Sequence, residues 1–200
     1  MKFEGQIVTI ILLASIGVVF ALQSTLQNIF DFQSFAFVPA YAFSRPWTFV
    51  TAMFLHADPT HIFFNGFALL IFGTYLEARV SKQTFILIYF LGGILGNIGY
   101  MITATNSLIP GIGASGAIYG IMGALAILAP RAVVFVYGIP MPMIAALFVW
   151  AALEIFGVFV PQGNIASGAH LFGLIAGVAF AFYLRWQYSS KTKLFFEDLK

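Results

Sequence analysis

The stretch GASGAIYG, residues 113–120, decides the fold because it places a serine at the start of a short, very apolar helix. Residues 115–129 carry no charge, and Pro130 closes the segment. As a helix it spans roughly 22 Å, whereas a bilayer core is about 30 Å thick. We therefore expect the helix to begin below one membrane surface, with the Ser115 hydroxyl submerged. Taken alone, Gly113, Gly116 and Gly120 favour simple helix packing, because small residues at this spacing let membrane helices approach closely.

The composition places this 200-residue chain in a membrane: 61% of its residues are hydrophobic, 8% are charged, and the mean hydropathy is +0.97. A net charge of +2 without a basic cluster argues against nucleic-acid binding. The absence of cysteine excludes disulfides and thiolate metal sites.

Six segments are long and apolar enough to cross a bilayer: 6–22, 61–78, 84–103, 115–129, 141–160 and 168–186. The run 132–139 is too short to span and precedes Pro140, so it is interpreted as a connector. These segments predict an all-α bundle of six transmembrane helices, a single domain over 1–200 with no appended soluble domain.

Basic residues set the expected orientation, since they concentrate on cytoplasmic loops. Only Arg45 lies on the face of the first, third and fifth loops. The others lie on the termini and the second and fourth loops: Lys2, Arg79, Lys82, Arg131, Arg185, Lys191, Lys193 and Lys200. We expect a multi-pass protein of the cell membrane with both termini cytoplasmic.

The first loop, 23–60, is long and rich in aromatic residues: Phe30, Phe32, Phe35, Phe37, Tyr41, Phe43, Trp47 and Phe49. Aromatic rings tolerate the headgroup region, so we expect a partly embedded hairpin in the outer interface. The alternative is an aromatic belt without a further role.

All three histidines lie in one predicted layer. His56 and His61 precede or open the second segment, and His170 lies in the first turn of the sixth. The second, fourth and sixth segments run in the same direction, so His61, Ser115 and His170 start parallel helices at similar depth. An ionisable group inside a membrane is costly unless paired, which makes these side chains candidates for function.

The sixth segment predicts a base for the serine. His170, Gly173 and Gly177 share one helical face, and the glycines let that face press against the glycines of the fourth segment. The imidazole then lies beside Ser115, where a general base is needed to activate a hydroxyl.

Acyl transfer also requires donors for an oxyanion, and the second segment supplies two. His61 and Asn65 are four residues apart and share a face. The backbone amide of Ser115, at a helix N-terminus, is a third candidate. On its own, Asn65 is more often a packing hydrogen bond.

One carboxyl group falls inside the predicted bundle near its outer end, that of Glu154. We expect it to form a local interhelical hydrogen bond, with contact to the active site as the alternative.

Together these motifs resemble the rhomboid intramembrane serine proteases. The matching elements are GASG at 113–116, AHLFG at 169–173 with Gly177, HIFFN at 61–65, His56, and EAR at 77–79, which resembles the family's Glu-x-Arg element. They cover nearly the whole chain, from the first loop to the sixth segment. One departure is Trp47-Thr48, where family members commonly have Trp-Arg.

The resemblance implies a catalytic dyad of Ser115 and His170 without an acid, and Tyr119 packed on the imidazole. It also implies an oxyanion hole of His61, Asn65 and the Ser115 amide. We expect an endopeptidase that cleaves transmembrane segments of other proteins, without metal or cofactor. Loop residues 161–164 suit a mobile cover over the site.

A rival hypothesis from another class is a small transporter or proton-relay protein using His56, His61, His170 and Glu154. A relay needs titratable groups along the full depth of the membrane, whereas the histidines occupy one layer. It also leaves Ser115 without a role. A third hypothesis, an inactive substrate-binding relative, conflicts with the intact serine and histidine.

Overall fold

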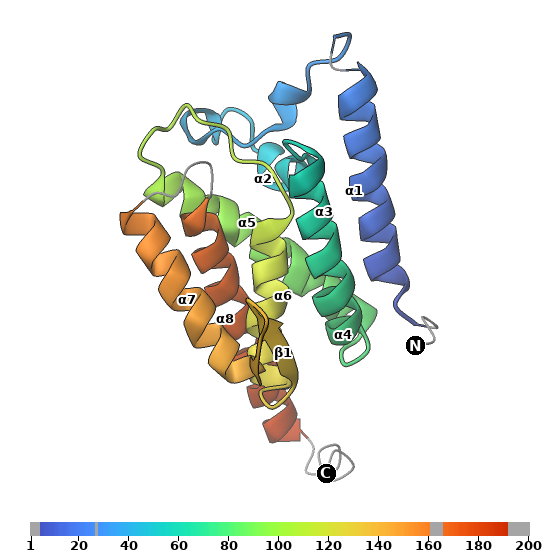
Figure 1. Ribbon diagram of the computed structural model, residues 1–200, viewed down its shortest axis with the longest axis vertical. Helices are drawn as coiled ribbons and strands as arrows, with labels where there is room; N and C mark the ends of the chain where they lie inside the picture. The colour runs from blue at the N-terminus through green and yellow to red at the C-terminus, as the bar shows by residue number, and fades with distance from the viewer. Residues whose placement is uncertain (1–4, 27, 161–165, 192–200) are drawn as a thin grey trace.

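The computed structural model describes residues 5–26, 28–160 and 166–191, which form a bundle of apolar helices (Figure 1). Four helical segments are long and apolar enough to cross a membrane. They are α1 (Ile7–Leu26), the continuous stack of α3 (Pro59–Ala68), η4 (Leu69–Gly73) and α4 (Thr74–Glu77), then α5 (Lys82–Thr103) and α8 (Ser167–Lys191). Two shorter apolar helices are α6 (Ser115–Leu128) and α7 (Met143–Phe159). The predicted all-α polytopic fold is confirmed, and the count of six spans stays a prediction.

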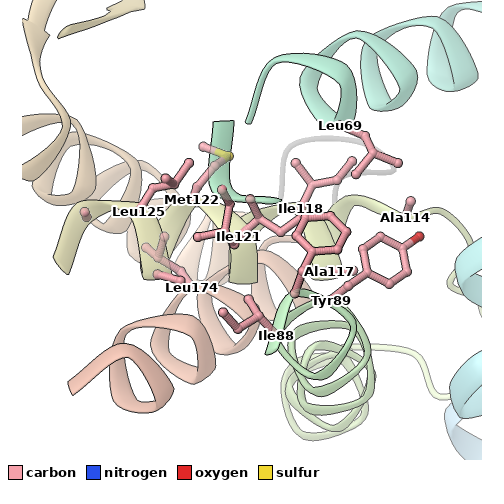
Figure 2. Packing of buried hydrophobic residues seen from close by; sticks show 14 of the residues in the cluster. Leu69, Ile88, Tyr89, Ala114, Ala117, Ile118, Ile121, Met122, Leu125 and Leu174 are labelled. Atoms are coloured by element: carbon pink, nitrogen blue, oxygen red, sulfur yellow. The ribbon is translucent and has the colours of Figure 1, made fainter. Parts of the chain in front are cut away.

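Helix α6 forms the centre of the bundle. Eleven of its 14 residues are buried, as expected for a helix that is hydrophobic on every side. Figure 2 shows Ile121 and Leu125 near Ile88 of α5 and Leu174 of α8, whereas Ile118 lies toward Leu69. The helix that carries Ser115 is therefore held by neighbours around most of its circumference.

Glycines bring α6 and α8 into backbone contact. A Cβ atom added to Gly173 would lie 2.1 Å from the carbonyl oxygen of Gly116, and one added to Gly177 would lie 1.8 Å from that of Gly120. Neither distance leaves room for a side chain. The glycine contact predicted between these helices is thus present, and it fixes the register of α8 against α6.

A buried carboxylate attaches α1 to the bundle. Glu77, at the end of α4, accepts hydrogen bonds from Val8 N (2.9 Å), Thr9 N (2.8 Å) and Thr9 Oγ1 (2.7 Å). A carboxylate at a helix N-terminus satisfies amides that lack an intrahelical acceptor. The Glu-x-Arg element therefore has a structural role at the end of the molecule where α1 begins (Figure 1).

The first loop folds into short helical turns in place of the expected hairpin. These are η1 (Phe32–Phe35), η2 (Pro39–Tyr41), α2 (Thr48–Thr51) and η3 (Ala52–Phe54). Asn97 of α5 donates to the Phe49 carbonyl at 2.9 Å, which fastens the loop to the bundle. Thr48, where the family commonly has arginine, is buried and donates to the Arg45 carbonyl at 2.7 Å. Its hydroxyl thus stabilises the loop locally.

The connector after α6 is a β-hairpin, which the sequence did not predict. Strands β1 (Val133–Val136) and β2 (Ile139–Pro142) pair antiparallel, with Val136 opposite Ile139. Tyr137 and Gly138 form the turn with φ of 50° and 81°, the left-handed backbone that a two-residue hairpin turn requires. Helix α7 begins at Met143, two residues after the start of the predicted segment 141–160, because Met141 and Pro142 pair with β1 as the end of β2.

Candidate active site

Ser115 is the first residue of α6, and the turn before it requires a glycine. Gly113 has φ of +121°, which disfavours residues with a side chain, and its amide donates to the Ala52 carbonyl at 2.9 Å. A Cβ atom on Gly113 would also lie 2.7 Å from His61 Nε2. This turn directs the half-buried Ser115 hydroxyl toward α8.

His170 lies within hydrogen-bonding distance of the serine. Its Nε2 atom is 2.8 Å from Ser115 Oγ. The ring stacks on Tyr119, one turn further along α6, with centroids 4.4 Å apart and planes 4° apart. The His170 side chain is 14% exposed. The hydroxyl and imidazole thus meet with a geometry suited to proton transfer.

Glu154 of α7 joins this pair. Its Oε1 atom is 3.0 Å from His170 Nδ1 and 2.5 Å from the Tyr119 hydroxyl. We expected a local interhelical hydrogen bond for Glu154, and the resemblance implied a dyad without an acid. The hydrogen bonds of Glu154 are interhelical, and both partners, Tyr119 of α6 and His170 of α8, lie around Ser115, which is the alternative of contact with the site. The rotation of α7 about its axis, which decides this contact, is not visible in the sequence.

His61 and Asn65 of α3 face the turn that leads into Ser115. The Ala57 amide donates to His61 Nδ1 at 3.3 Å, so a neutral His61 carries its proton on Nε2, the atom beside Gly113. Asn65 Nδ2 donates to the His61 carbonyl at 3.0 Å and retains a second hydrogen. It lies 3.9 Å from the Cβ position of Gly113. Both side chains can donate toward a group bound at Ser115.

His56 packs behind His61 and takes no part in this set of hydrogen bonds. It is 2% exposed, and its ring meets that of His61 edge to face with centroids 5.0 Å apart. Within the part of the chain that the structure describes, neither ring nitrogen has a partner. Burial lowers the pKa of His56 to about 4, so the ring is neutral at physiological pH. It acts as an apolar support for His61.

A cavity of about 360 Å³ lies beside the serine. Its polar lining includes Asn65, Ser115 and Tyr119, whereas aromatic side chains form much of the remaining wall. They come from three elements: Phe64, Phe67 and Phe72 of the α3–η4 segment, Trp150 of α7, and Phe135 and Tyr137 of the hairpin. We did not foresee the hairpin residues here. The only signal was a short apolar run, 132–139, which is too short for a helix span.

Two further expectations from the sequence concern metal binding and a cover over the site. Over residues 5–26, 28–160 and 166–191, no cluster of three histidine or acidic side chains is arranged to hold a metal ion. The proposed cover, 161–164, lies outside the described residues.

Comparison with known proteins gives consistent matches. A family model described as the Rhomboid domain matches residues 44–187. The chain is 35% identical over 136 residues to "Putative rhomboid protease YdcA" of Bacillus subtilis, covering 68% of this chain and 66% of that protein. It is 30% identical over 169 residues to Rhomboid-like protease 3 of Toxoplasma gondii, covering 80% of this chain and 60% of that protein. It is also 33% identical over 79 residues to Inactive RHOMBOID-like protein 8 of Arabidopsis thaliana, covering 40% of this chain and 22% of that protein. The chain thus spans less than two thirds of the length of each of these relatives.

Proposed function

Because the chain belongs to the rhomboid family, we propose that it is an intramembrane serine endopeptidase with Ser115 as nucleophile and His170 as base. The observation that carries this proposal is the 2.8 Å separation of Ser115 Oγ and His170 Nε2 at the start of a buried helix. A serine hydroxyl becomes a nucleophile when a neighbouring base accepts its proton.

The proposed reaction is acyl transfer followed by hydrolysis. His170 Nε2 takes the Ser115 proton while Oγ attacks the peptide carbonyl, and the oxyanion forms beside the donors of His61, Asn65 and the Ser115 amide. His170 then protonates the departing amine. Water then attacks the acyl-enzyme while His170 accepts its proton. His170 returns that proton to Ser115 Oγ as the acyl group leaves.

The wall of the cavity supports a membrane-embedded substrate. Side chains such as Phe67, Phe72 and Trp150 suit an apolar segment, and Ser115 lies among them. A substrate helix has to unwind locally there, because its backbone carbonyls are otherwise engaged within the helix. Transmembrane segments of other proteins are therefore the proposed substrates, with the lipid bilayer as the surroundings and no metal or cofactor.

The proposed orientation places both termini in the cytoplasm and the site toward the outer face. Eight of the nine basic residues support it, because they lie on the termini and on the loops at that end.

The transporter hypothesis has weaker support. In the described residues, His56, His61, His170 and Glu154 lie near one another, close to where α3, α6 and α8 begin. Glu77, at the other end, is engaged with the backbone of α1. The hydrogen bonds of Glu154 run to His170 and Tyr119 within the first group, and the buried hydroxyl of Tyr89 has no hydrogen-bond partner among the described residues, which does not suit a proton relay.

The test is cleavage of a single-span model substrate by the purified protein in liposomes, with the products mapped by mass spectrometry. We expect a cut within or next to the transmembrane segment, and none with Ser115→Ala. Ser15→Ala is the matched control, since that hydroxyl bonds only the Ile11 carbonyl of its own helix. One relative is named inactive, so cleavage that persists in Ser115→Ala, or is absent from the wild type, overturns the proposal.

A further inference from the structure

Glu154 is a buried acid that a serine and histidine dyad does not require. Its helix buries one stripe against the bundle, formed by Met143, Ala146, Trp150, Glu154 and Gly157. Four members of this stripe are apolar or small, whereas Phe148, Phe156 and Phe159 are exposed on other faces of α7. A carboxyl group in such a stripe is costly inside a membrane unless it is paired. Packing alone therefore does not explain a glutamate at position 154.

The contacts of Glu154 are arranged as in a catalytic triad. Its Oε1 meets His170 at Nδ1, the ring nitrogen opposite the one that meets Ser115. In serine proteases a carboxylate in this place holds the imidazole in the correct tautomer and stabilises the imidazolium that forms. A carboxyl group that served only to join helices could bond any polar atom nearby.

We propose that Glu154 is the positioning residue of the Ser115 and His170 pair. It keeps the His170 proton on Nδ1, so that Nε2 presents its lone pair to the serine. During the reaction the serine proton moves to Nε2, while the Nδ1 proton stays between the ring and the carboxylate. This inference rests on the proposed protease function and adds a third residue to it.

Tyr119 sets the position of the carboxyl group. Its hydroxyl donates to the same Oε1 atom at 2.5 Å, while its ring stacks on His170. The Ser167 side chain also interacts with the carboxyl group. Glu154 is consequently held from α6 and α8 together and is 7% exposed. This restraint fixes the angle from which it meets the imidazole.

The most direct test is the tautomer of His170, measured by ¹⁵N NMR of histidine-labelled protein in bilayers at neutral pH. The chain has three histidines, so single substitutions assign the signals. We expect a protonated Nδ1 and an unprotonated Nε2 for His170, and loss of this preference in Glu154→Gln. A wild-type His170 with its proton on Nε2 overturns the inference, even if the Gln variant fails to fold.

Kinetics supply the second readout. Glu154→Gln keeps the size of the side chain but can donate to Nδ1 and stabilise the wrong tautomer, so we expect kcat to fall on the order of 10⁴-fold with KM nearly unchanged. Tyr119→Phe retains the ring stack and the carboxyl group and should lose less. Glu77→Gln, a buried glutamate at the other end of the bundle, is the matched control: it should lower the Tm and leave kcat unchanged.

The outcomes separate this inference from the proposed function. If Ser115→Ala is inactive and Glu154→Gln retains wild-type kcat, only the role of Glu154 is wrong. If Ser115→Ala remains active, the protease mechanism itself is wrong.

Discussion

At the scale of single residues, the proposed mechanism gives different tasks to two imidazoles. His170 meets Ser115 Oγ through Nε2, whereas His61 turns a protonated Nε2 toward the Gly113 turn. The first can accept a proton, and the second can only donate. This difference in hydrogen bonding follows from the partner of each Nδ1 atom: Glu154 for His170, and the Ala57 amide for His61.

The two tasks predict different mutant phenotypes. Removing one oxyanion donor costs on the order of a hundredfold to a thousandfold in turnover, and less where donors are redundant. We therefore expect His61→Ala and Asn65→Ala each to retain measurable cleavage, while His170→Ala retains none. Initial rates on the model substrate measure this. If His170→Ala cleaves and Asn65→Ala is fully inactive, the assignment of base and donor is reversed.

His56 predicts a pH dependence of stability. Its pKa is about 4 in the folded protein and near 6.5 when unfolded, so between these values the unfolded chain binds more protons. The contribution of His56 to the free energy of unfolding is complete above pH 6.5. It falls by about 3 kcal/mol as the pH drops to 4. Melting of wild type and His56→Gln at pH 7 and pH 4.5 measures it. We expect the drop in Tm to be smaller in the variant, and equal drops would contradict a neutral, buried His56.

The residues of the site differed in how well the sequence predicted them. Ser115, His170, His61 and Asn65 were predicted because each lies at a fixed offset within a helix start, where three parallel helices share one depth. The contact of Glu154 depends on how α7 rotates against α6 and α8. Hydropathy does not define that rotation, so its place beside His170 needed the structure.

At the scale of elements, the α6–α8 contact determines whether the serine and histidine meet. The two helices approach through backbone atoms at Gly116 and Gly120 on one side and Gly173 and Gly177 on the other. Van der Waals contact is the main attraction available to helices in lipid, so small residues provide stability as well as proximity. A side chain added to Gly173 or Gly177 would separate the helix that carries Ser115 from the one that carries His170.

This contact predicts that Gly173→Val and Gly177→Val lose both stability and activity. The added carbon would overlap the carbonyl oxygens of Gly116 and Gly120, and overpacking of this kind costs about 1–3 kcal/mol or more. Thermal melting and cleavage rates check the prediction. Gly17→Val on α1, where a Cβ meets nothing within 4 Å, is the control and should change neither. Unchanged melting in the α8 variants would mean that these glycines face lipid.

Elements between the long helices were the least predictable. The hairpin of β1 and β2 was interpreted as a connector, because eight apolar residues next to prolines fit no span. Its turn uses positive φ at Tyr137, a conformation that residue type alone does not indicate. The first loop likewise uses short helical turns stabilised by tertiary contacts, such as that between Asn97 and Phe49.

At the scale of the whole molecule, composition and periodicity predicted the helical bundle because a membrane restricts the choices. A chain in lipid has to satisfy its backbone polar groups internally, which favours apolar helices of defined length. The short helix α6 is the exception, since it starts part of the way into the bundle and brings the Ser115 hydroxyl, the proposed nucleophile, to that depth. The surrounding helices α3, α7 and α8 then supply the other polar groups, which lie around Ser115 and the turn before it.

In the proposed mechanism, His170 activates Ser115 for nucleophilic attack. Labelling of the intact protein with a fluorophosphonate probe, followed by peptide mapping of the modified residue, measures this without knowledge of the natural substrate. We predict one phosphonylated residue, Ser115, in the wild type, and no labelling of Ser115 in His170→Ala. Labelling of a different serine, or undiminished labelling of Ser115 without His170, would contradict the account.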